Sequence, residues 1–172
     1  MVLLFRLIWT LFTSRFRPRI DPLGEAVIRM RVWPNDLDLN IHVSSGRYLS
    51  FMDVGRVDLL IRFRVFRKAF RRGWRPINAG TIISFRKSLL PFERFSVRSR
   101  VICWDEKWIF FEHIVDKANG DRAAIANSRG LLRGSSGNVR PQEFLEAAGH
   151  GDLQSPPMPP HVARWIEAEA AR

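Results

Sequence analysis

Four polar residues in one turn-prone stretch recur at every second position: Asp36, Asp38, Asn40 and His42. An extended backbone would point their side chains to one side and the apolar residues between them to the other. A carboxylate, an amide and an imidazole would then share one face. Such a set could activate a water molecule, or its carboxylate could attack a carbonyl carbon directly.

The residues that follow this stretch are typical of the start of a helix. Ser44, Ser45 and Gly46 supply two hydroxyl groups that can cap a helix and one flexible residue. The first N–H groups of a helix have no acceptor within it, so they attract negative charge. The backbone near Ser45 and Gly46 is therefore a candidate site for stabilising an oxyanion.

A purely structural interpretation of the same residues is also open. Asp38 and Asn40 are residue types that hydrogen-bond to nearby backbone in loops, and either one alone would more often have that role. The polar alternation that leads into a helix start favours the functional interpretation of the whole stretch.

Hydropathy periodicity predicts the elements that would position these residues. Residues 25–33 alternate as a half-buried strand, and residues 47–72 carry apolar side chains at the three- and four-residue spacing of a long buried helix. Four further runs predict an antiparallel meander, and two short helices follow it: 79–90, 92–104, 108–116 and 122–133, then 141–148 and 160–172. This order predicts an α+β domain in which a curved antiparallel sheet wraps a long central helix.

The polar stretch resembles the signature of hotdog-fold thioesterases, D-x-D-x-x-x-H-x-N-N-x-x-Y. Asp36, Asp38, His42 and Tyr48 match it, whereas serines replace the asparagine pair. Residues 38–42 are also similar to the D-x-N-x-H core of the acyl-ACP thioesterases, and Asp38 falls where 4-hydroxybenzoyl-CoA thioesterase keeps its catalytic carboxylate. Residues 89–92, 103–105 and 159–166 resemble proteins of the "thioesterase superfamily member six" type.

The resemblance implies a hotdog fold, an assembly of at least two copies, and hydrolysis of acyl-CoA or acyl carrier protein thioesters without a cofactor. The residues that it implies for the chemistry are Asp38, Asn40, His42, Ser45 and Gly46, and those for substrate binding are Tyr48, Arg86 and Lys87. The alternative is a catalytically silent hotdog protein that binds acyl-CoA or lipid at a membrane surface. Residues 85–89 favour this alternative, because the acyl-ACP enzymes carry an acid and a cysteine there.

The net charge of +11 is concentrated in one part of the chain. Residues 62–100 hold twelve arginines and lysines against Glu93 alone. This field would attract coenzyme A phosphates, an acidic carrier protein or anionic lipid headgroups. No recognised nucleic-acid module is present, so we expect no nucleic-acid partner. No metal-ligand spacing occurs, and the single cysteine, Cys103, is expected to be a small buried apolar residue.

Residues 1–22 form an amphipathic segment and linker before a domain over residues 23–140 and a helical extension over residues 141–172. A helix over the first residues would carry a narrow polar stripe of Arg6, Thr10, Ser14 and Arg17 on a broad apolar surface. The apolar run is too short to span a membrane. Two interpretations stay open, an in-plane membrane anchor and a helix packed on the domain or on a second copy. We expect a cytoplasmic protein, either free or peripheral on the cytosolic face of a membrane.

Overall fold

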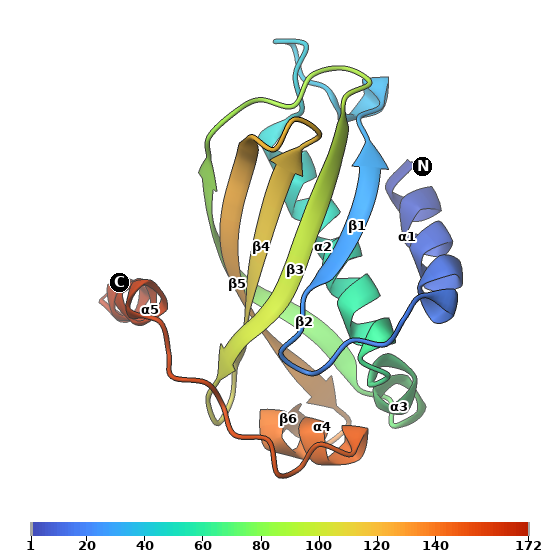
Figure 1. The fold of residues 1–172 in the computed structure, drawn as a ribbon. Coiled ribbons are helices and arrows are strands. Elements are labelled where there is room, and N and C mark those ends of the chain that lie inside the picture. Colours follow the sequence, from blue (N-terminus) through green and yellow to red (C-terminus); the bar gives the residue numbers. More distant parts are fainter. Residues whose placement is uncertain (1, 172) are drawn as a thin grey trace.

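A six-stranded antiparallel sheet curls around one long helix in the computed structural model, which describes residues 2–171 (Figure 1). The strands run in the spatial order β1-β3-β4-β5-β2, and β6 pairs with β5. Their bounds are β1 Ala26–Arg31, β2 Arg75–Phe85, β3 Arg94–Trp104, β4 Ile109–Lys117, β5 Arg122–Gly134 and β6 Gly137–Val139. The helices are α1 Val2–Thr13, α2 Ser45–Arg62, α3 Phe66–Arg71, α4 Pro141–Ala148 and α5 Pro160–Ala170, with single 3-10 turns at Ser14–Phe16 and Pro34–Asp36.

The hydrophobic core lies between α2 and the concave face of the sheet. Phe51 and Met52 of α2 pack among inward-facing residues of the strands, and the ring of Phe51 lies 4.8 Å from that of Phe95 on β3. The helix packs tightly on the sheet at Gly55, where a Cβ atom would sit 2.5 Å from the Ser99 hydroxyl oxygen. The predicted arrangement of a central helix wrapped by an antiparallel sheet is confirmed.

The boundaries of several elements differ from the predicted ones. The helix predicted over residues 47–72 is interrupted, because Arg64 adopts a left-handed conformation with φ 62° between α2 and α3. This turn buries both Phe63 and Val65, which a straight helix would place on different faces. The next strand begins at Arg75 instead of residue 79. After Gly134, where the sheet was predicted to end, the chain adds the short strand β6.

The other turns and the C-terminal helices agree with the sequence patterns. The Asn119-Gly120 pair, a sequence typical of tight hairpin turns, lies in the turn that joins β4 to β5, with Gly120 at φ 88°. The helix α5 packs on the opposite side of the sheet from α2, where Val162 and Trp165 contact Cys103 and Phe110. Cys103 is buried, as expected.

The first helix, α1, packs beside α2 with its polar stripe turned inward (Figure 1). Arg6, Thr10 and Ser14 are buried. Ser14 donates a 2.5 Å hydrogen bond to the carboxylate of Asp58, a fully buried residue of α2 that also pairs with Arg17 and Arg62. The contacts of this segment therefore agree with the interpretation of a helix packed on the domain, although the apolar side of the helix faces outward. None of the described helices is both long and apolar enough to cross a bilayer.

Candidate active site at the start of the central helix

The turn-prone stretch from Asp36 to His42 folds into a tight turn and is not extended. Leu37 and Val43 form an isolated bridge, and the N–H of Asp38 donates a 2.9 Å hydrogen bond to the carbonyl of His42. Ile41 closes the turn with φ 58°. The expected two-sided pattern is wrong because a turn does not alternate its side chains. Leu39, one of the apolar residues between the polar positions, lies at the tip and is fully exposed at 102%.

Asp36 is a structural residue in this fold. Its carboxylate is 1% exposed, accepts hydrogen bonds of 2.8 and 2.7 Å from Arg6, and accepts a third of 2.9 Å from the backbone N–H of Trp33. These three bonds occupy both carboxylate oxygens. Asp36 therefore fixes the entry to the turn and does not share a face with Asp38.

Asp38 and His42 lie side by side across the mouth of the turn. The Oδ1 atom of Asp38 accepts a 2.9 Å hydrogen bond from the N–H of Asn40 and lies 3.3 Å from Nδ1 of His42. The two side chains are 32% and 35% exposed, so solvent and a ligand can reach both. Asn40 is exposed at the tip of the turn. Asp38 thus forms the Asx turn of the structural interpretation while its second carboxylate oxygen stays available.

The start of α2 lies three residues beyond His42, at most about 11 Å along the chain. Ser44 occupies the N-cap position without a capping bond from its side chain. No bond from the backbone N–H of Ser45 or Gly46 is found among residues 2–171. A Cβ atom built on Gly46 would meet nothing within 4 Å, so no neighbouring side chain crowds this residue. The geometry suits a site for a developing negative charge.

Tyr48, a candidate for substrate binding, belongs to the core. It is 3% exposed, and its hydroxyl oxygen accepts a 3.4 Å hydrogen bond from the N–H of Leu89. Burial raises the pKa of this phenol above its usual value. Its ring contacts that of Phe85 at 5.1 Å, which brings the end of β2 beside the start of α2.

Arg86 and Lys87 follow directly after β2, so this contact places them near the candidate site. Both donate their backbone N–H to the carbonyl of Ala123. The ammonium group of Lys87 pairs with Asp121 at 2.8 Å, whereas the guanidinium group of Arg86 has no ion-pair partner among the described residues. Arg86 is therefore the better placed of the two to meet an anionic group of a ligand.

A cavity of about 290 Å³ lies farther along α2, between that helix and strands β2, β4 and β5. Its lining is largely apolar, with Leu60, Phe111 and Phe144 among the contributors, and Asp53 and Arg56 supply its charged groups. The guanidinium group of Arg56 donates to the carboxylate of Asp53 at 2.9 Å, three residues earlier on the same helix.

A buried polar cluster around His113 lies next to Arg56 of this cavity and was not predicted from the sequence. His113 is 0% exposed, with Nδ1 2.9 Å from the Ser99 hydroxyl and Nε2 3.1 Å from the Ser128 hydroxyl. Burial, helped by the positive charge of Arg56, lowers the pKa of His113 to about 3, so the imidazole is neutral. The position of His113 between the inward-facing Phe111 and Val115 on one strand is the signal that could have identified it as a core residue.

The titratable residues do not form a metal site in the described part of the chain. No group of three or more histidine, cysteine, aspartate or glutamate side chains has the arrangement to hold an ion there. The chemistry of the candidate site is therefore derived from Asp38, His42 and the backbone at Ser45 and Gly46.

Comparison with known proteins identifies the family. Residues 32–166 match the thioesterase-like superfamily. Protein THEM6 from Danio rerio is 30% identical over 162 residues, which cover 92% of this chain and 78% of that protein. Protein THEM6 from Xenopus laevis is 29% identical over 157 residues, covering 88% and 74%. A probable thioesterase from Saccharomyces cerevisiae is 28% identical over 121 residues, covering 67% and 51%.

Solved structures show the same fold at low sequence identity. The probable thioesterase YbaW from Escherichia coli has a TM-score of 0.67 at 16% identity, covering 73% of this chain and 97% of that one. A DHNA-CoA thioesterase from Staphylococcus aureus has a TM-score of 0.67 at 11% identity, covering 85% and 95%. These likenesses confirm the hotdog fold. The family match over residues 32–166 shows that the chain belongs to the thioesterase-like superfamily.

Proposed function

We propose that this protein hydrolyses acyl-CoA thioesters to a free acid and a thiol. The observation that carries the proposal is the solvent-accessible carboxylate of Asp38 beside His42, in the turn that leads into α2, where the N–H groups of Ser45 and Gly46 have no acceptor among the described residues. Hydrolysis of a thioester needs an activated attacking group and a donor for the oxyanion, and this arrangement supplies both.

In the proposed reaction the thioester carbonyl oxygen accepts hydrogen bonds from the N–H groups of Ser45 and Gly46. Asp38 either takes a proton from a water molecule that attacks the carbonyl carbon, or attacks that carbon itself and forms an anhydride that water then cleaves. In both routes the carbon–sulfur bond breaks, and the thiolate leaves and takes up a proton. His42 and Asn40 position the water or the thioester.

Coenzyme A as the carrier is supported by the neighbouring basic residues and by similar proteins. Arg86 is exposed beside the candidate site and can meet a phosphate group. The DHNA-CoA thioesterase from Staphylococcus aureus shares the fold, and another protein of that fold from the same organism, with a TM-score of 0.63 at 14% identity, was solved in complex with CoA. The apolar cavity along α2 would receive the acyl chain. An acyl carrier protein is the alternative carrier.

We also propose that the protein is a homodimer joined along β2. This strand of 11 residues is the last in the sheet order and is largely exposed, so one edge of its backbone has no strand partner among the described residues. Its exposed side chains include Ile82 and Phe85. A long apolar edge is a ready template for pairing with a second copy.

Release of free thiol from acyl-CoA substrates over a series of chain lengths tests the proposed activity. We expect turnover by the unaltered protein and its loss in Asp38→Ala. The matched control is Asp152→Ala, which removes an exposed acid from the connector before α5 and should leave turnover unchanged. Full activity in Asp38→Ala would show that Asp38 is not the catalytic carboxylate.

A catalytically silent protein that binds acyl-CoA or lipid at a membrane surface is the second candidate. The hydrogen bond from the N–H of Asn40 to Oδ1 of Asp38 favours this candidate, because it engages one carboxylate oxygen in the turn. Calorimetry with the same acyl-CoA series separates the two candidates, because tight binding without thiol release at any chain length supports the silent protein.

A further inference from the structure

The orientation of α1 is opposite to that of an ordinary surface helix. A surface helix turns its apolar stripe toward the core and its polar face to water. Here Arg6, Thr10 and Ser14 face the domain, whereas six large apolar side chains point into solvent. These six residues, which we call the outer face, are Leu4, Phe5, Ile8, Trp9, Phe12 and Phe16.

Specific polar bonds hold α1 in this orientation. Arg6 is fixed by Asp36, by the carbonyl of Arg31 at 2.7 Å and by the ring of Phe51 at 4.9 Å, and Ser14 is fixed by Asp58. Rotation of the helix to bury the outer face would break these bonds, which would remove Arg6 from the buried carboxylate of Asp36 and the Ser14 hydroxyl from that of Asp58. Exposure of the outer face is therefore built into the fold.

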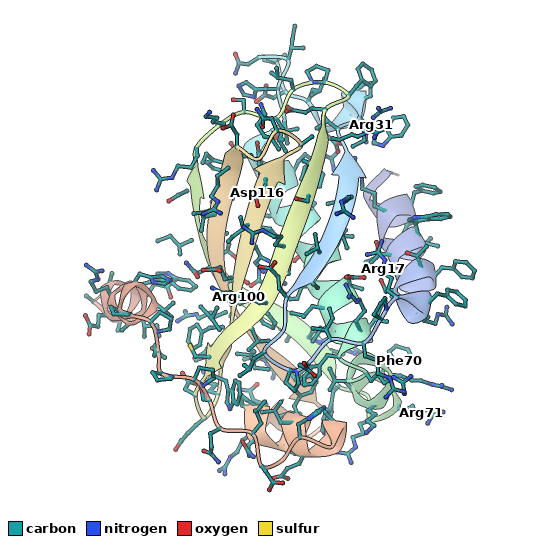
Figure 2. The ribbon with its side chains drawn as sticks, in the orientation of Figure 1. Arg17, Arg31, Phe70, Arg71, Arg100 and Asp116 are labelled. Carbon is teal, nitrogen blue, oxygen red and sulfur yellow. The ribbon has the colours of Figure 1, made fainter. Side chains whose placement is uncertain are left out.

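An unpaired basic cluster lies at the C-terminal end of the outer face. The linker after α1 packs against the end of α2. The guanidinium group of Arg62 donates to the carbonyl of Pro18, and the backbone carbonyl of Arg62 accepts from the N–H of Ile20. The short helix α3 follows there, and Phe70 and Arg71 project outward on the side of the molecule that carries α1 (Figure 2). Phe70 is 76% exposed. We define the basic cluster as Arg15, Arg19, Arg67, Lys68 and Arg71, all exposed.

The pairing of charges distinguishes this cluster from the arginines of the sheet. Arg98 pairs with Asp116 at 2.9 Å, and Arg100 pairs with Glu112 at 2.8 Å, so these charges are largely compensated. Members of the basic cluster have no ion-pair partner within residues 2–171. The first 20 residues also contain no acid.

We propose that the outer face and the basic cluster together form a docking surface for an anionic lipid bilayer. The apolar side chains would enter the boundary between headgroups and acyl chains, and the cluster would contact lipid phosphates. A second copy of the chain would cover the apolar side chains but would offer no acid to the cluster from its own outer face. Because α1 is bonded to Asp36 and Asp58, docking would hold the whole domain in one orientation on the bilayer.

Vesicle flotation of the full chain tests this proposal. With vesicles of phosphatidylcholine and anionic phosphatidylglycerol, we expect the protein to float, and to float less with phosphatidylcholine alone or at high salt. The double variant Trp9→Ser/Phe12→Ser should bind about tenfold or more weakly, because it removes two aromatic groups from the outer face. Leu90→Ser, at an exposed apolar residue on the loop between β2 and β3, is the matched control and should bind normally.

A charge variant tests the basic cluster independently of α1. Arg71→Glu should weaken flotation severalfold, whereas Arg94→Glu, with the same change in net charge at the start of β3, should not. If the Trp9→Ser/Phe12→Ser variant does not fold, the comparison of Arg71→Glu with Arg94→Glu decides the test. The proposal is wrong if the unaltered chain does not float, or if Arg71→Glu and Arg94→Glu weaken flotation equally. It is also wrong if the α1 variant alters only the oligomeric state, since the outer face is then a contact between copies.

Discussion

Arg6 on the first helix and Asp36 at the entry to the turn that carries Asp38 form a buried, bidentate ion pair, with hydrogen bonds of 2.8 and 2.7 Å. The pair joins an element at the start of the chain to a residue 30 positions later. Asp36 in turn accepts the N–H of Trp33 and so orders the 3-10 turn before Asp38. The position of the candidate catalytic carboxylate therefore depends on the packing of α1.

Removal of Arg6 should destabilise the protein strongly. In Arg6→Ala the carboxylate of Asp36 would stay buried without its cation, and loss of one partner of such a pair costs about 3–5 kcal/mol. Urea unfolding measures this change. Arg15→Ala removes an exposed arginine from the same segment and should alter stability by less than about 0.5 kcal/mol. An equally small effect of Arg6→Ala would contradict the structural role of the pair.

Replacement of Asp38 by asparagine should separate the fold of the turn from its chemistry. An asparagine oxygen can still accept the N–H of Asn40, so Asp38→Asn should keep its stability within about 0.5 kcal/mol of the unaltered protein. The amide cannot act as a base or nucleophile, and thiol release should fall by about 100-fold or more. Parallel urea unfolding and thiol-release measurements check both expectations. Unchanged turnover would assign Asp38 to the turn alone.

His113 should make the protein less stable in mild acid. The pKa of the buried imidazole is lowered to about 3 from 6.5, so between these pH values the unfolded chain binds a proton that the folded chain does not. The contribution of His113 to stability is complete above pH 6.5 and is lost as the pH falls toward 3. Between pH 7 and pH 5 the loss should be about 2 kcal/mol.

Urea unfolding at these two pH values measures the loss. His113→Gln removes the titrating group, so the fall in stability should be smaller in this variant by about the same 2 kcal/mol. The exposed His161 provides a matched control, and His161→Gln should keep the full fall. Identical pH dependence in the unaltered protein and in His113→Gln would refute this assignment.

A charge placed on β2 should separate the proposed homodimer. Ile82 lies within this edge strand and is 48% exposed. In Ile82→Glu both copies would carry an acid on the pairing strand, and the uncompensated charge should weaken association by about tenfold or more. Sedimentation velocity should show a dimer for the unaltered protein and a shift to monomer for the variant. Leu23→Glu, on the linker after α1, should stay dimeric.

The sequence by itself determined the elements whose signals are local. The alternating strands, the apolar spacing of the central helix and the Asn119-Gly120 turn each depend on neighbours within a few residues, and each is present in the structure. The helix start at Ser45 was also readable, because capping residue types act on the adjacent backbone.

The tertiary structure decided the roles of residues whose partners are distant in sequence. Asp36 and Asp38 have the same local sequence signal. The ion pair with Arg6 gives Asp36 a structural role, whereas the turn leaves Asp38 accessible to solvent. The polar stripe of α1 was visible, but only Asp36 and Asp58 decide that it faces inward. His113 is neutral because distant elements of the fold bury it and place the positive charge of Arg56 beside it. Burial and long-range pairing set these outcomes, and neither is encoded in the local periodicity of the chain.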